Sequence, residues 1–313
     1  MSGAFEILKK NLHGSVARNV LLKNYAYYQI GGPADIFVEP ADDADLELVL
    51  QTCHDTKLPL TVIGAGTNLL VRDGGVRGAT LFLGAGLPGD IKILSEKEDF
   101  VRVRVPAHWP KARLLDVALD NSWSGLEFSA GIPGTLGGAV WMNAGTKWGH
   151  YGEVIEKVRL FNITNGFREK TNKEMGFKYR GIGEGLLDAQ TIIVSVDIKL
   201  SKKKSALESR ALVDEILCYR GSKQPLELPN CGSVFKNPPN SEKGAGRLIE
   251  AAGLKGFCIG DAMISTKHAN FILNLGKASS KDVEALISRC QYEVKKQFGI
   301  DLEPEVIVIG EKI

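Results

Sequence analysis

The segment from Cys231 to Pro238 reads CGSVFKNP and places a thiol and a hydroxyl two positions apart, with a glycine between them. Either group could do chemistry, because a thiolate is a nucleophile and a hydroxyl can donate a proton in a prepared site. The same residues also suit a structural turn, in which the Ser233 side chain bonds to nearby backbone. No histidine stands beside Cys231 in the sequence to activate its thiol. The rest of the chain has to decide among these hypotheses.

Two glycine-rich segments indicate where a ligand could lie close to the backbone. The first, VIGAGTNLLV, follows an apolar run typical of a strand, and its N–H groups could surround a phosphate. It is not a dinucleotide fingerprint of the Rossmann type, because that motif would need glycine where Leu69 stands. The second, GIPGTLGGAVWMNAG (131–145), carries little side-chain bulk and suits backbone that lies along a flat ligand. A tight turn would explain either segment alone, but together they predict a long cofactor.

Length and composition set limits on the class of protein. A chain of 313 residues with 44% hydrophobic and 24% charged residues is typical of a globular protein with two or three domains. Lys and Arg number 39 and Asp and Glu number 37, an excess of 39 − 37 = 2. Such a balance gives no broad positive field for nucleic acid or an anionic membrane. We therefore expect partners that are small molecules.

The cysteines and the N-terminus predict the cellular compartment. The five cysteines are widely scattered and form no CxxC pair, so neither a disulfide framework nor a metal site is expected. The first twenty-five residues hold no continuous apolar core of a signal peptide, and no later run is long enough to span a bilayer. The sequence predicts a cytoplasmic protein.

Periodicity along the chain predicts an α+β organisation. Helices are expected over 44–57, 110–121, 246–253 and 279–298, and strands over 58–64, 100–105, 154–163, 190–200, 270–275 and 305–309. The polar stretch SKKKS (201–205) is expected to be a domain boundary, although a solvated loop would look the same.

Seven segments, in order along nearly the whole chain, resemble the UDP-N-acetylenolpyruvoylglucosamine reductase (UDP-N-acetylmuramate dehydrogenase) family. They are IGGPAD (30–35), GAGTNLLV (64–71), GLEFSAGIPGTLGGAVWMNAG (125–145), CGSVFKNP (231–238), GRLIEAAGLKG (246–256), KHANFILN (267–274) and LEPEV (302–306). The short stretch between the expected strands 154–163 and 190–200 resembles the shorter family type, which lacks an inserted tyrosine-bearing loop.

The resemblance implies a fold and its division. The α+β fold would hold an FAD-binding domain of the vanillyl-alcohol oxidase type, made of two subdomains, and a C-terminal α+β substrate-binding domain. The expected boundaries are 1–83 for the first FAD-binding subdomain, 84–200 for the second, 201–303 for the substrate-binding domain and 304–313 for a terminal strand with the catalytic glutamate.

The resemblance also implies the cofactor and the segments that hold it. Non-covalent FAD would have its pyrophosphate on the first glycine segment and its ring system along the second. The expected FAD-binding residues are Gly64, Ala65, Gly66, Thr67, Asn68, Gly131, Ile132, Pro133, Gly134, Gly137, Gly138, Asn143 and Gly145.

The reaction implied by the family passes a hydride from NADPH to FAD and then to the enolpyruvyl ether of UDP-N-acetylglucosamine, which yields UDP-N-acetylmuramate for peptidoglycan. Ser233 matches the family's proton donor, Arg180 its carboxylate-polarising arginine and Glu305 its glutamate near the same centre. Without these matches, Arg180 and Glu305 would pass for surface charges. For the substrate or NADPH phosphates, the resemblance points to Tyr179, Lys223, Lys236 and Asn237, although either lysine could be a solvated surface charge.

The chain departs from the family pattern at three places. Gly181 and Ile182 follow Tyr179 and Arg180 where a serine is usual, YAYYQ precedes IGGPAD, and TKWGH follows MNAG. Two alternatives therefore stay open. One is a sugar or alcohol oxidase on the same flavin fold, with His150 or Cys231 as the nearest candidates for a covalent flavin link. The other is a degenerate flavin-fold protein. We expect a monomer.

Overall fold

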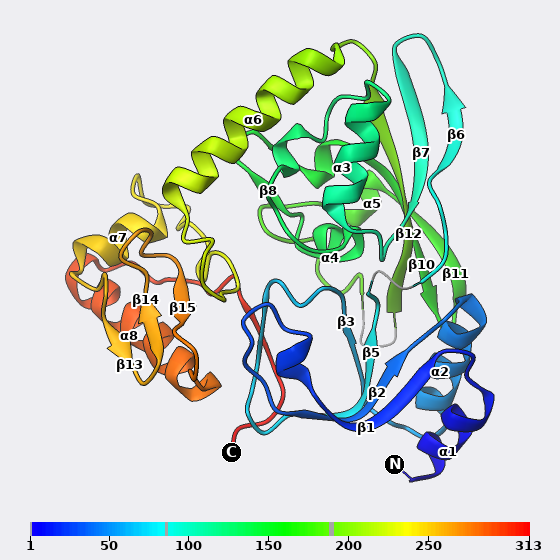
Figure 1. The fold of residues 1–313 in the computed structure, drawn as a ribbon, viewed down its shortest axis with the longest axis horizontal. Helices are drawn as coiled ribbons and strands as arrows, with labels where there is room; N and C mark the ends of the chain where they lie inside the picture. The colour runs from blue at the N-terminus through cyan, green and yellow to red at the C-terminus, as the bar shows by residue number, and fades with distance from the viewer. Residues whose placement is uncertain (1, 85–86, 188–190) are drawn as a thin grey trace. The chain divides into compact units, whose positions relative to one another are not determined.

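The computed structural model describes residues 2–84, 87–187 and 191–313 (Figure 1). Within these ranges the α-helices are α1 (Ser2–Asn11), α2 (Asp43–Asp55), α3 (Lys111–Asp120), α4 (Leu136–Trp141), α5 (Asn172–Met175), α6 (Ala206–Lys223), α7 (Ala245–Ala251) and α8 (Ser280–Phe298). Short 3₁₀ turns cover Leu22–Asn24, Glu127–Ser129 and Tyr151–Glu153.

The strands form two larger and three smaller sheets. The four-stranded sheet has the order β1 (Ser15–Leu21), β2 (Pro33–Glu39), β5 (Val76–Phe82), β3 (Leu60–Ile63). The five-stranded sheet has the order β11 (Gly166–Thr171), β10 (Ile155–Asn162), β12 (Thr191–Ser201), β7 (Phe100–Pro106), β6 (Lys92–Glu96). The smaller sheets are β13 (Cys258–Ile259), β14 (Ala262–Ile264) and β15 (Ile272–Asn274); β16 (Ile307–Ile309) with β4 (Leu69–Val71); and β8 (Gly145–Thr146) with β9 (Gly149–His150).

The α+β class expected from the sequence is confirmed, and the expected elements occur close to their predicted bounds. The helix expected over 44–57 covers Asp43–Asp55, and that expected over 279–298 covers Ser280–Phe298. The strand expected over 190–200 covers Thr191–Ser201, and its first predicted residue, Gln190, lies outside the described residues.

Local sequence explains where these elements begin and how they face. Helix α8 starts at a capping box in which Ser279 and Asp282 bond reciprocally, and it ends at Gly299 in the left-handed conformation. In β7 the alternation VRVRV places Val101, Val103 and Val105 in the core. Arg104 faces outward, where its Nε lies 2.6 Å from Asp197 Oδ1 on β12. The strand thus has one buried and one polar face, as its alternation predicts.

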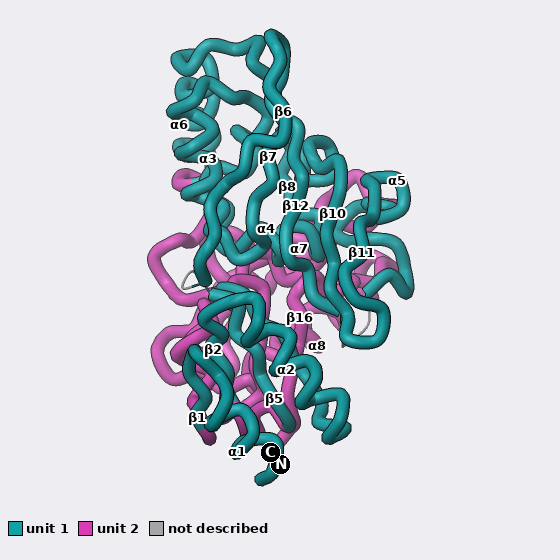
Figure 2. The backbone as a smooth tube through the Cα atoms, turned by 90° about the vertical axis from the view of Figure 1, so that its right-hand side faces the viewer, with its two compact units in different colours: residues 1–17, 37–65, 78–220 teal, residues 18–36, 66–77, 221–313 magenta. Residues whose placement is uncertain are grey.

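The chain divides into two units, which Figure 2 colours separately. Unit 1 comprises residues 1–17, 37–65 and 78–220, and unit 2 comprises 18–36, 66–77 and 221–313. Each has a hydrophobic core of its own. The core of unit 1 joins the five-stranded sheet to α3 and α4, whereas that of unit 2 joins α7 and α8 to β14 and β15. The expected four-segment division stays a prediction.

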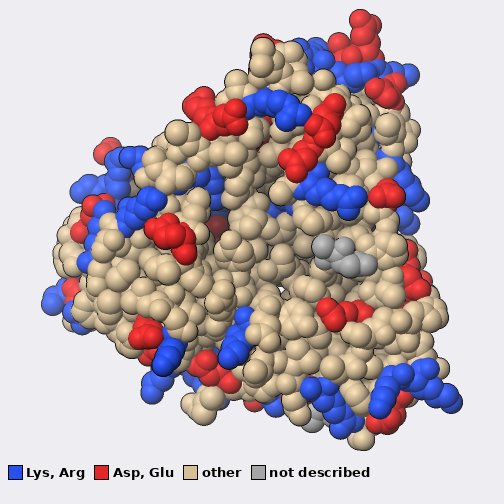
Figure 3. Space-filling view, in the orientation of Figure 1, with Lys and Arg blue, Asp and Glu red and all other residues tan. Residues whose placement is uncertain are grey.

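The surface shows no dominance of one charge sign on the face drawn in Figure 3, where basic and acidic side chains lie interspersed. This mixture accords with the small net charge of the whole chain. Among the described residues, no helix combines the length and the apolar character needed to cross a membrane.

Candidate active site

The turn that carries Ser233 lies in unit 2 and is held by Asn270. The Asn270 side chain accepts a hydrogen bond from the Phe235 N–H at 3.0 Å and donates one to the Phe235 carbonyl at 2.8 Å. The backbone carbonyl of Asn270 accepts from the Val234 N–H at 2.8 Å. Ser233 itself is half-buried, and its hydroxyl makes no hydrogen bond within the described residues. The backbone that follows Ser233 is therefore fixed, whereas its hydroxyl can still bond to another group.

Glu305 comes to the same turn through backbone pairing. Its N–H donates to the Val234 carbonyl at 2.7 Å, and the Lys236 N–H donates to the Glu303 carbonyl at 2.9 Å. Both segments belong to unit 2. The structure thus brings Glu305 beside the residue that follows Ser233, as the proposed joint role requires.

Cys231 differs sharply from Ser233 in its surroundings. Only 2% of its surface is exposed, and burial raises the pKa of its thiol well above the usual value, with a further contribution from the Glu305 carboxylate. A thiol under these conditions stays protonated and is a poor nucleophile at neutral pH. This environment argues against Cys231 as the reactive group in the CGSVFKNP turn.

Arg180 lies in unit 1, on a turn with unusual backbone geometry. Its φ angle is +52°, and the turn closes through mutual backbone bonds between Lys178 and Gly181 of 3.0 and 3.2 Å. Asn143 anchors this turn: its Nδ2 donates to the Lys178 carbonyl at 2.9 Å, and its Oδ1 accepts from the Gly152 N–H at 2.8 Å. Asn143, expected as a cofactor contact, thus has a positioning task inside the protein.

The two glycine segments meet in unit 1. A β-carbon on Gly64 would lie 2.6 Å from Thr135 Oγ1, so only glycine allows this approach. Thr135 caps α4 through the Gly138 N–H. Gly131 and Gly134 have φ angles of +70° and +114°, in the region that favours glycine. A β-carbon on Gly138 would meet nothing closer than Thr135 Oγ1 at 3.5 Å, and Gly138 is exposed. This segment can accept a planar group along its backbone.

The remaining residues of the first glycine segment belong to unit 2. A β-carbon on Gly66 would lie 2.2 Å from the Tyr25 carbonyl oxygen, so glycine is required there by the fold itself. Asn68 Nδ2 donates to the Glu305 carbonyl at 3.0 Å, and the Asn68 carbonyl accepts from the Ile307 N–H at 3.0 Å. One residue of the expected phosphate loop therefore also fixes the segment that carries Glu305.

The other expected cofactor residues vary in exposure. Ala65 and Pro133 are exposed, whereas Thr67, Ile132 and Gly137 are half-buried. A β-carbon on Gly145 would lie 2.5 Å from the Gly149 carbonyl, because β8 and β9 form a tight hairpin. The glycine at this position is thus explained by packing.

The expected substrate contacts differ in their exposure and in the bonds that they make to the rest of the protein. Lys236 Nζ lies 2.6 Å from Glu303 Oε1, and Asn237 Oδ1 accepts from the Ala245 N–H at 3.0 Å at the start of α7. Tyr179 is 55% exposed and its ring lies 5.2 Å from the Arg180 guanidinium carbon. Lys223 is exposed at the end of α6. Tyr179, Lys223 and Asn237 are therefore exposed, whereas Lys236 is half-buried.

Lys111 is a buried cation that the sequence expectations missed. It is only 4% exposed, and its backbone N–H donates to the Gly134 carbonyl at 3.0 Å. A signal was present in the sequence: the buried residues of α3 are Lys111, Leu114, Leu115, Ala118 and Leu119, which follow the spacing of an apolar stripe. A lysine at the head of such a stripe is directed toward the core.

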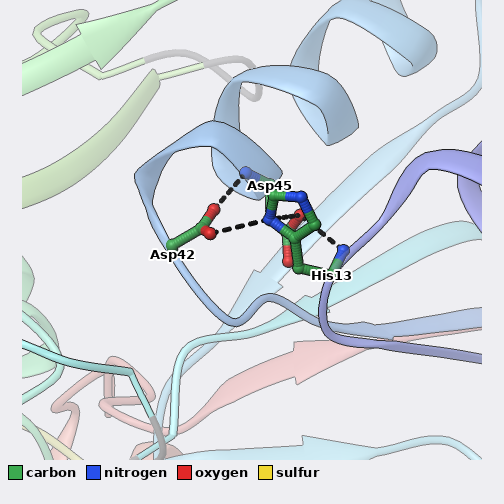
Figure 4. A group of neighbouring side chains, drawn as sticks. All are labelled: His13, Asp42 and Asp45. Atoms are coloured by element: carbon green, nitrogen blue, oxygen red, sulfur yellow. Dashed lines mark hydrogen bonds and ion pairs between the residues drawn. The ribbon is translucent and has the colours of Figure 1, made fainter.

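His13, Asp42 and Asp45 form a group whose ligand atoms are close enough for a metal ion (Figure 4). The Asp45 carboxylate, however, accepts from the N–H groups of His13, Gly14 and Ala41 at 2.8 to 2.9 Å. Asp42 caps α2 and lies 2.8 Å from His13 Nδ1. These bonds explain the group as the junction between α2 and the segment before β1.

Comparison with known proteins identifies the family. Residues 34–170 match the model of an FAD binding domain, and residues 224–309 match the model described as UDP-N-acetylenolpyruvoylglucosamine reductase, C-terminal domain. The chain is 38% identical over 302 residues to the protein of that name from Listeria monocytogenes serotype 4b (strain CLIP80459), with 96% of each chain covered. The chain belongs to the UDP-N-acetylenolpyruvoylglucosamine reductase family.

Further relatives agree with this assignment. The reductase from Pediococcus pentosaceus is 40% identical over 291 residues, which is 93% of each chain. The crystal structure of UDP-N-acetylenolpyruvylglucosamine reductase from Thermus caldophilus superposes with a TM-score of 0.77 at 35% identity, over 95% of this chain and 100% of that one. The expected organisation as an FAD-binding domain followed by a C-terminal domain of this family is confirmed.

The residues of unit 1 fit the FAD that the family implies. An exposed helix glycine, Gly138, and two glycines with left-handed φ angles leave the segment 131–138 without side-chain bulk. Arg220 donates to the Gly131 carbonyl at 3.0 Å, which places a cation beside this segment. The lack of side-chain bulk leaves room for a planar group, and a nearby cation suits the phosphates of FAD.

Proposed function

We propose that this chain catalyses the NADPH-dependent reduction of UDP-N-acetylglucosamine enolpyruvate to UDP-N-acetylmuramate in peptidoglycan synthesis. The likeness to the reductases described above supports the proposal over nearly the full length of the chain. The structural observation that carries it is the pairing of the Ser233 turn with the Glu305 segment. The proposed proton donor, Ser233, and the carboxylate of Glu305 therefore both belong to unit 2.

Bound FAD supplies the hydride, taken from NADPH, that reduces the methylene carbon of the enolpyruvyl double bond. The Ser233 hydroxyl then donates its proton to the neighbouring carbon, and solvent returns a proton to the serine. A hydroxyl is a weak acid, but an enolate carbon is basic enough to accept its proton. A neutral donor also avoids placing another negative charge beside the substrate carboxylate.

Arg180 would stabilise the negative charge that develops on that carboxylate. A guanidinium offers two parallel N–H donors to a carboxylate, which a lysine cannot match. Glu305 would orient the Ser233 hydroxyl or the water that reprotonates it, because its backbone is bonded directly to Val234.

The nucleotide and sugar portions need donors for phosphate oxygens. Lys223 and Tyr179 are exposed, so both side chains are accessible to a phosphate. Lys236 would have to exchange Glu303 for the ligand, and Asn237 would act through its amide while its oxygen caps α7. We therefore propose Lys223 and Tyr179 as the principal contacts of this set.

We further propose that the protein acts as a monomer in the cytoplasm. All five cysteines are free, and Cys218 and Cys258 are exposed thiols, which suits a reducing compartment.

The oxidase alternative, with flavin attached through His150 or Cys231, finds less support. His150 Nδ1 lies 3.2 Å from Asn143 Oδ1 and its Nε2 lies 3.4 Å from Glu153, while Cys231 is buried. Both ring nitrogens of His150 thus lie near acceptors of the protein, and the Cys231 thiol is shielded from a ligand. Release of all flavin on acid denaturation is the expected outcome, and retained flavin would favour the oxidase.

Anaerobic stopped flow tests the proposal in two halves. NADPH should bleach the FAD absorbance, and the enolpyruvyl substrate should restore it. In Ser233→Ala the first half should be unchanged, and the second should slow by roughly a hundredfold to ten-thousandfold, as for loss of a general acid. The matched variant Cys231→Ser should retain both halves. Normal reoxidation in Ser233→Ala with slow reoxidation in Cys231→Ser would overturn the assignment of the proton donor.

A further inference from the structure

Lys111 holds an ammonium group where an isolated cation is costly. The residue is 96% buried, and no hydrogen bond or ion pair of its side chain is found in the described parts of the chain. It is the first residue of α3, where the helix dipole also disfavours a positive charge. A leucine would fill the same volume without this penalty. A buried lysine retained under these conditions calls for an electron-rich group that compensates it.

The charges that act on Lys111 are themselves positive. They come from Arg180, on the turn after α5, and Arg220, on α6, and both belong to unit 1 with Lys111. Burial is the largest cause that lowers the pKa of Lys111 and the charges of Arg220 and Arg180 add to it, so that the pKa falls to about 7. Burial also lowers the pKa of Arg220, whose buried Nε has no hydrogen-bond partner in the described residues. Three cations are thus gathered with no acidic group among the charges that act on Lys111.

Two of these cations are tied to the same stretch of backbone. The Lys111 N–H donates to the Gly134 carbonyl, and an Arg220 guanidinium nitrogen donates to the Gly131 carbonyl, each at 3.0 Å. Residues 131–134 lie within the region that matches the FAD binding domain model. The backbone of Lys111 and the guanidinium of Arg220 therefore both contact residues 131–134, the segment that we expect along the planar part of FAD.

We propose that Lys111 is a protonatable positioning residue of the FAD site, whose ammonium, with Arg180 and Arg220, favours reduction of FAD and takes up a proton when FAD is reduced. The inference rests on FAD binding, as the proposed function does. Reduction adds negative charge above the cations, and an added negative charge favours the protonated form of a nearby amine. The negative charge of reduced FAD therefore offsets part of the repulsion among the three cations.

The step balances in atoms and charge. FAD accepts a hydride from NADPH, which leaves NADP⁺ and an anionic reduced flavin. The fraction of Lys111 that is neutral takes a proton from solvent and becomes an ammonium ion. The overall change is FAD plus NADPH plus Lys–NH₂ plus H⁺ giving FADH⁻ plus NADP⁺ plus Lys–NH₃⁺.

The test is the midpoint potential of bound FAD, measured by photoreduction against a reference dye, without NADPH or enolpyruvyl substrate. In Lys111→Met the equilibrium constant for reduction at about pH 6 should fall on the order of tenfold, which is about 30 mV for a two-electron couple. At about pH 9 the variant and the wild type should agree, because this pH lies above the pKa of Lys111 in both the oxidised and the reduced protein. Lys92→Met, at an exposed lysine of β6, should match the wild type at both pH values.

Three outcomes would overturn the inference. An unchanged potential in FAD-bound Lys111→Met at about pH 6 is the first. The second is an unchanged potential with a slower reaction of the enolpyruvyl substrate, which would assign the cation to the substrate carboxylate.

The third applies to the wild type and does not depend on the variant folding. Photoreduction at about pH 8 should take up more than one proton per FAD, and uptake of only one would overturn the inference. Because the potential and the proton uptake are measured without the enolpyruvyl substrate, loss of the proposed function would leave these two results unaffected. Conversely, a normal reductase with an unchanged potential would remove only the role of Lys111.

Discussion

Two buried asparagines, one in each unit, hold turns that carry proposed catalytic side chains, and they do so in different ways. Asn270 holds the Ser233 turn with two side-chain bonds to Phe235, and that turn is also paired by backbone with residues 303 to 306. Asn143 holds the Arg180 turn through one bond to the Lys178 carbonyl, and the turn otherwise closes on itself. The turn of the proposed proton donor is thus fixed from two sides, whereas the turn of Arg180 depends on a single side-chain anchor.

The difference suits the two tasks. Proton transfer requires heavy atoms within hydrogen-bond reach of each other, so its donor benefits from a doubly fixed backbone. The charge of Arg180 also acts through its electric field, which changes more gradually with position than a hydrogen bond does. The Arg180 turn also adopts a left-handed conformation that costs backbone energy. We therefore expect removal of Asn270 to affect the fold most, and removal of Asn143 to affect mainly the chemistry of Arg180.

The largest effect is expected for Asn270→Ala. The variant leaves the buried N–H and carbonyl of Phe235 without side-chain partners, which costs roughly 1–3 kcal/mol for each group. Urea denaturation should show the free energy of unfolding lowered by roughly 2–5 kcal/mol. Asn240→Ala, at an exposed asparagine of the same unit, should change it by less than about 0.5 kcal/mol. Equal stability of the two variants would show that Asn270 is not the anchor described here.

A smaller and more selective effect is expected for Asn143→Gly. Glycine accepts the φ angle of +40° found at this position, so the change removes the side-chain bonds without adding backbone strain. Stability should fall by about 1–3 kcal/mol, while reoxidation of FAD by the enolpyruvyl substrate slows and reduction by NADPH persists. Lys57→Gly, at an exposed position of unit 1 with φ of +52°, is the matched control. Equal slowing of both halves in Asn143→Gly would instead point to a role in FAD binding.

The smallest effect is expected for the pKa values of His13 and Asp42, which form an exposed pair. A hydrogen bond with Asp42 raises the pKa of His13, and bonds from the Asp45 N–H and from His13 lower the pKa of Asp42. Because the folded pKa of His13 is raised, its contribution to stability is present at low pH and is lost as pH rises through that folded value. The contribution of Asp42 to stability is present above the pKa of Asp in the unfolded chain. It is lost as pH falls through the lowered pKa of Asp42 in the folded protein.

Proton NMR of the His13 ring measures this pair directly. In Asp42→Asn the pKa of His13 should fall toward its ordinary value, while asparagine preserves the cap of α2. An unchanged pKa would assign the shift to Asp45, whose Oδ1 lies 3.8 Å from His13 Nδ1.

Much of the fold could be predicted because its signals are local. The alternation in β7 and the periodicity of α8 are written in neighbouring residues, and both elements occur where they were expected. The site residues, by contrast, came from whole motifs and not from periodicity. The partners of Asn143 and Asn270 lie up to 35 positions away in the chain, so single-sequence patterns could not show their anchoring roles.

Lys111 escaped prediction for a different reason. The spacing of the apolar stripe in α3 places Lys111 in the core. Lysines, however, are mostly found at the surface, so a prediction from residue type alone places Lys111 there. The conflict between spacing and residue type was itself the signal. Such conflicts are expected where function outweighs packing.

The bond between Asn68 and Glu305 has a consequence for the order in which the protein is made. These residues are 237 positions apart, and the next residues pair β4 with β16, among the last elements of the chain. During synthesis residues 64–71 emerge long before residues 305–309, and contacts of such long range form late. The backbone of this glycine segment therefore completes its hydrogen bonds only after residues 305–309 have been made.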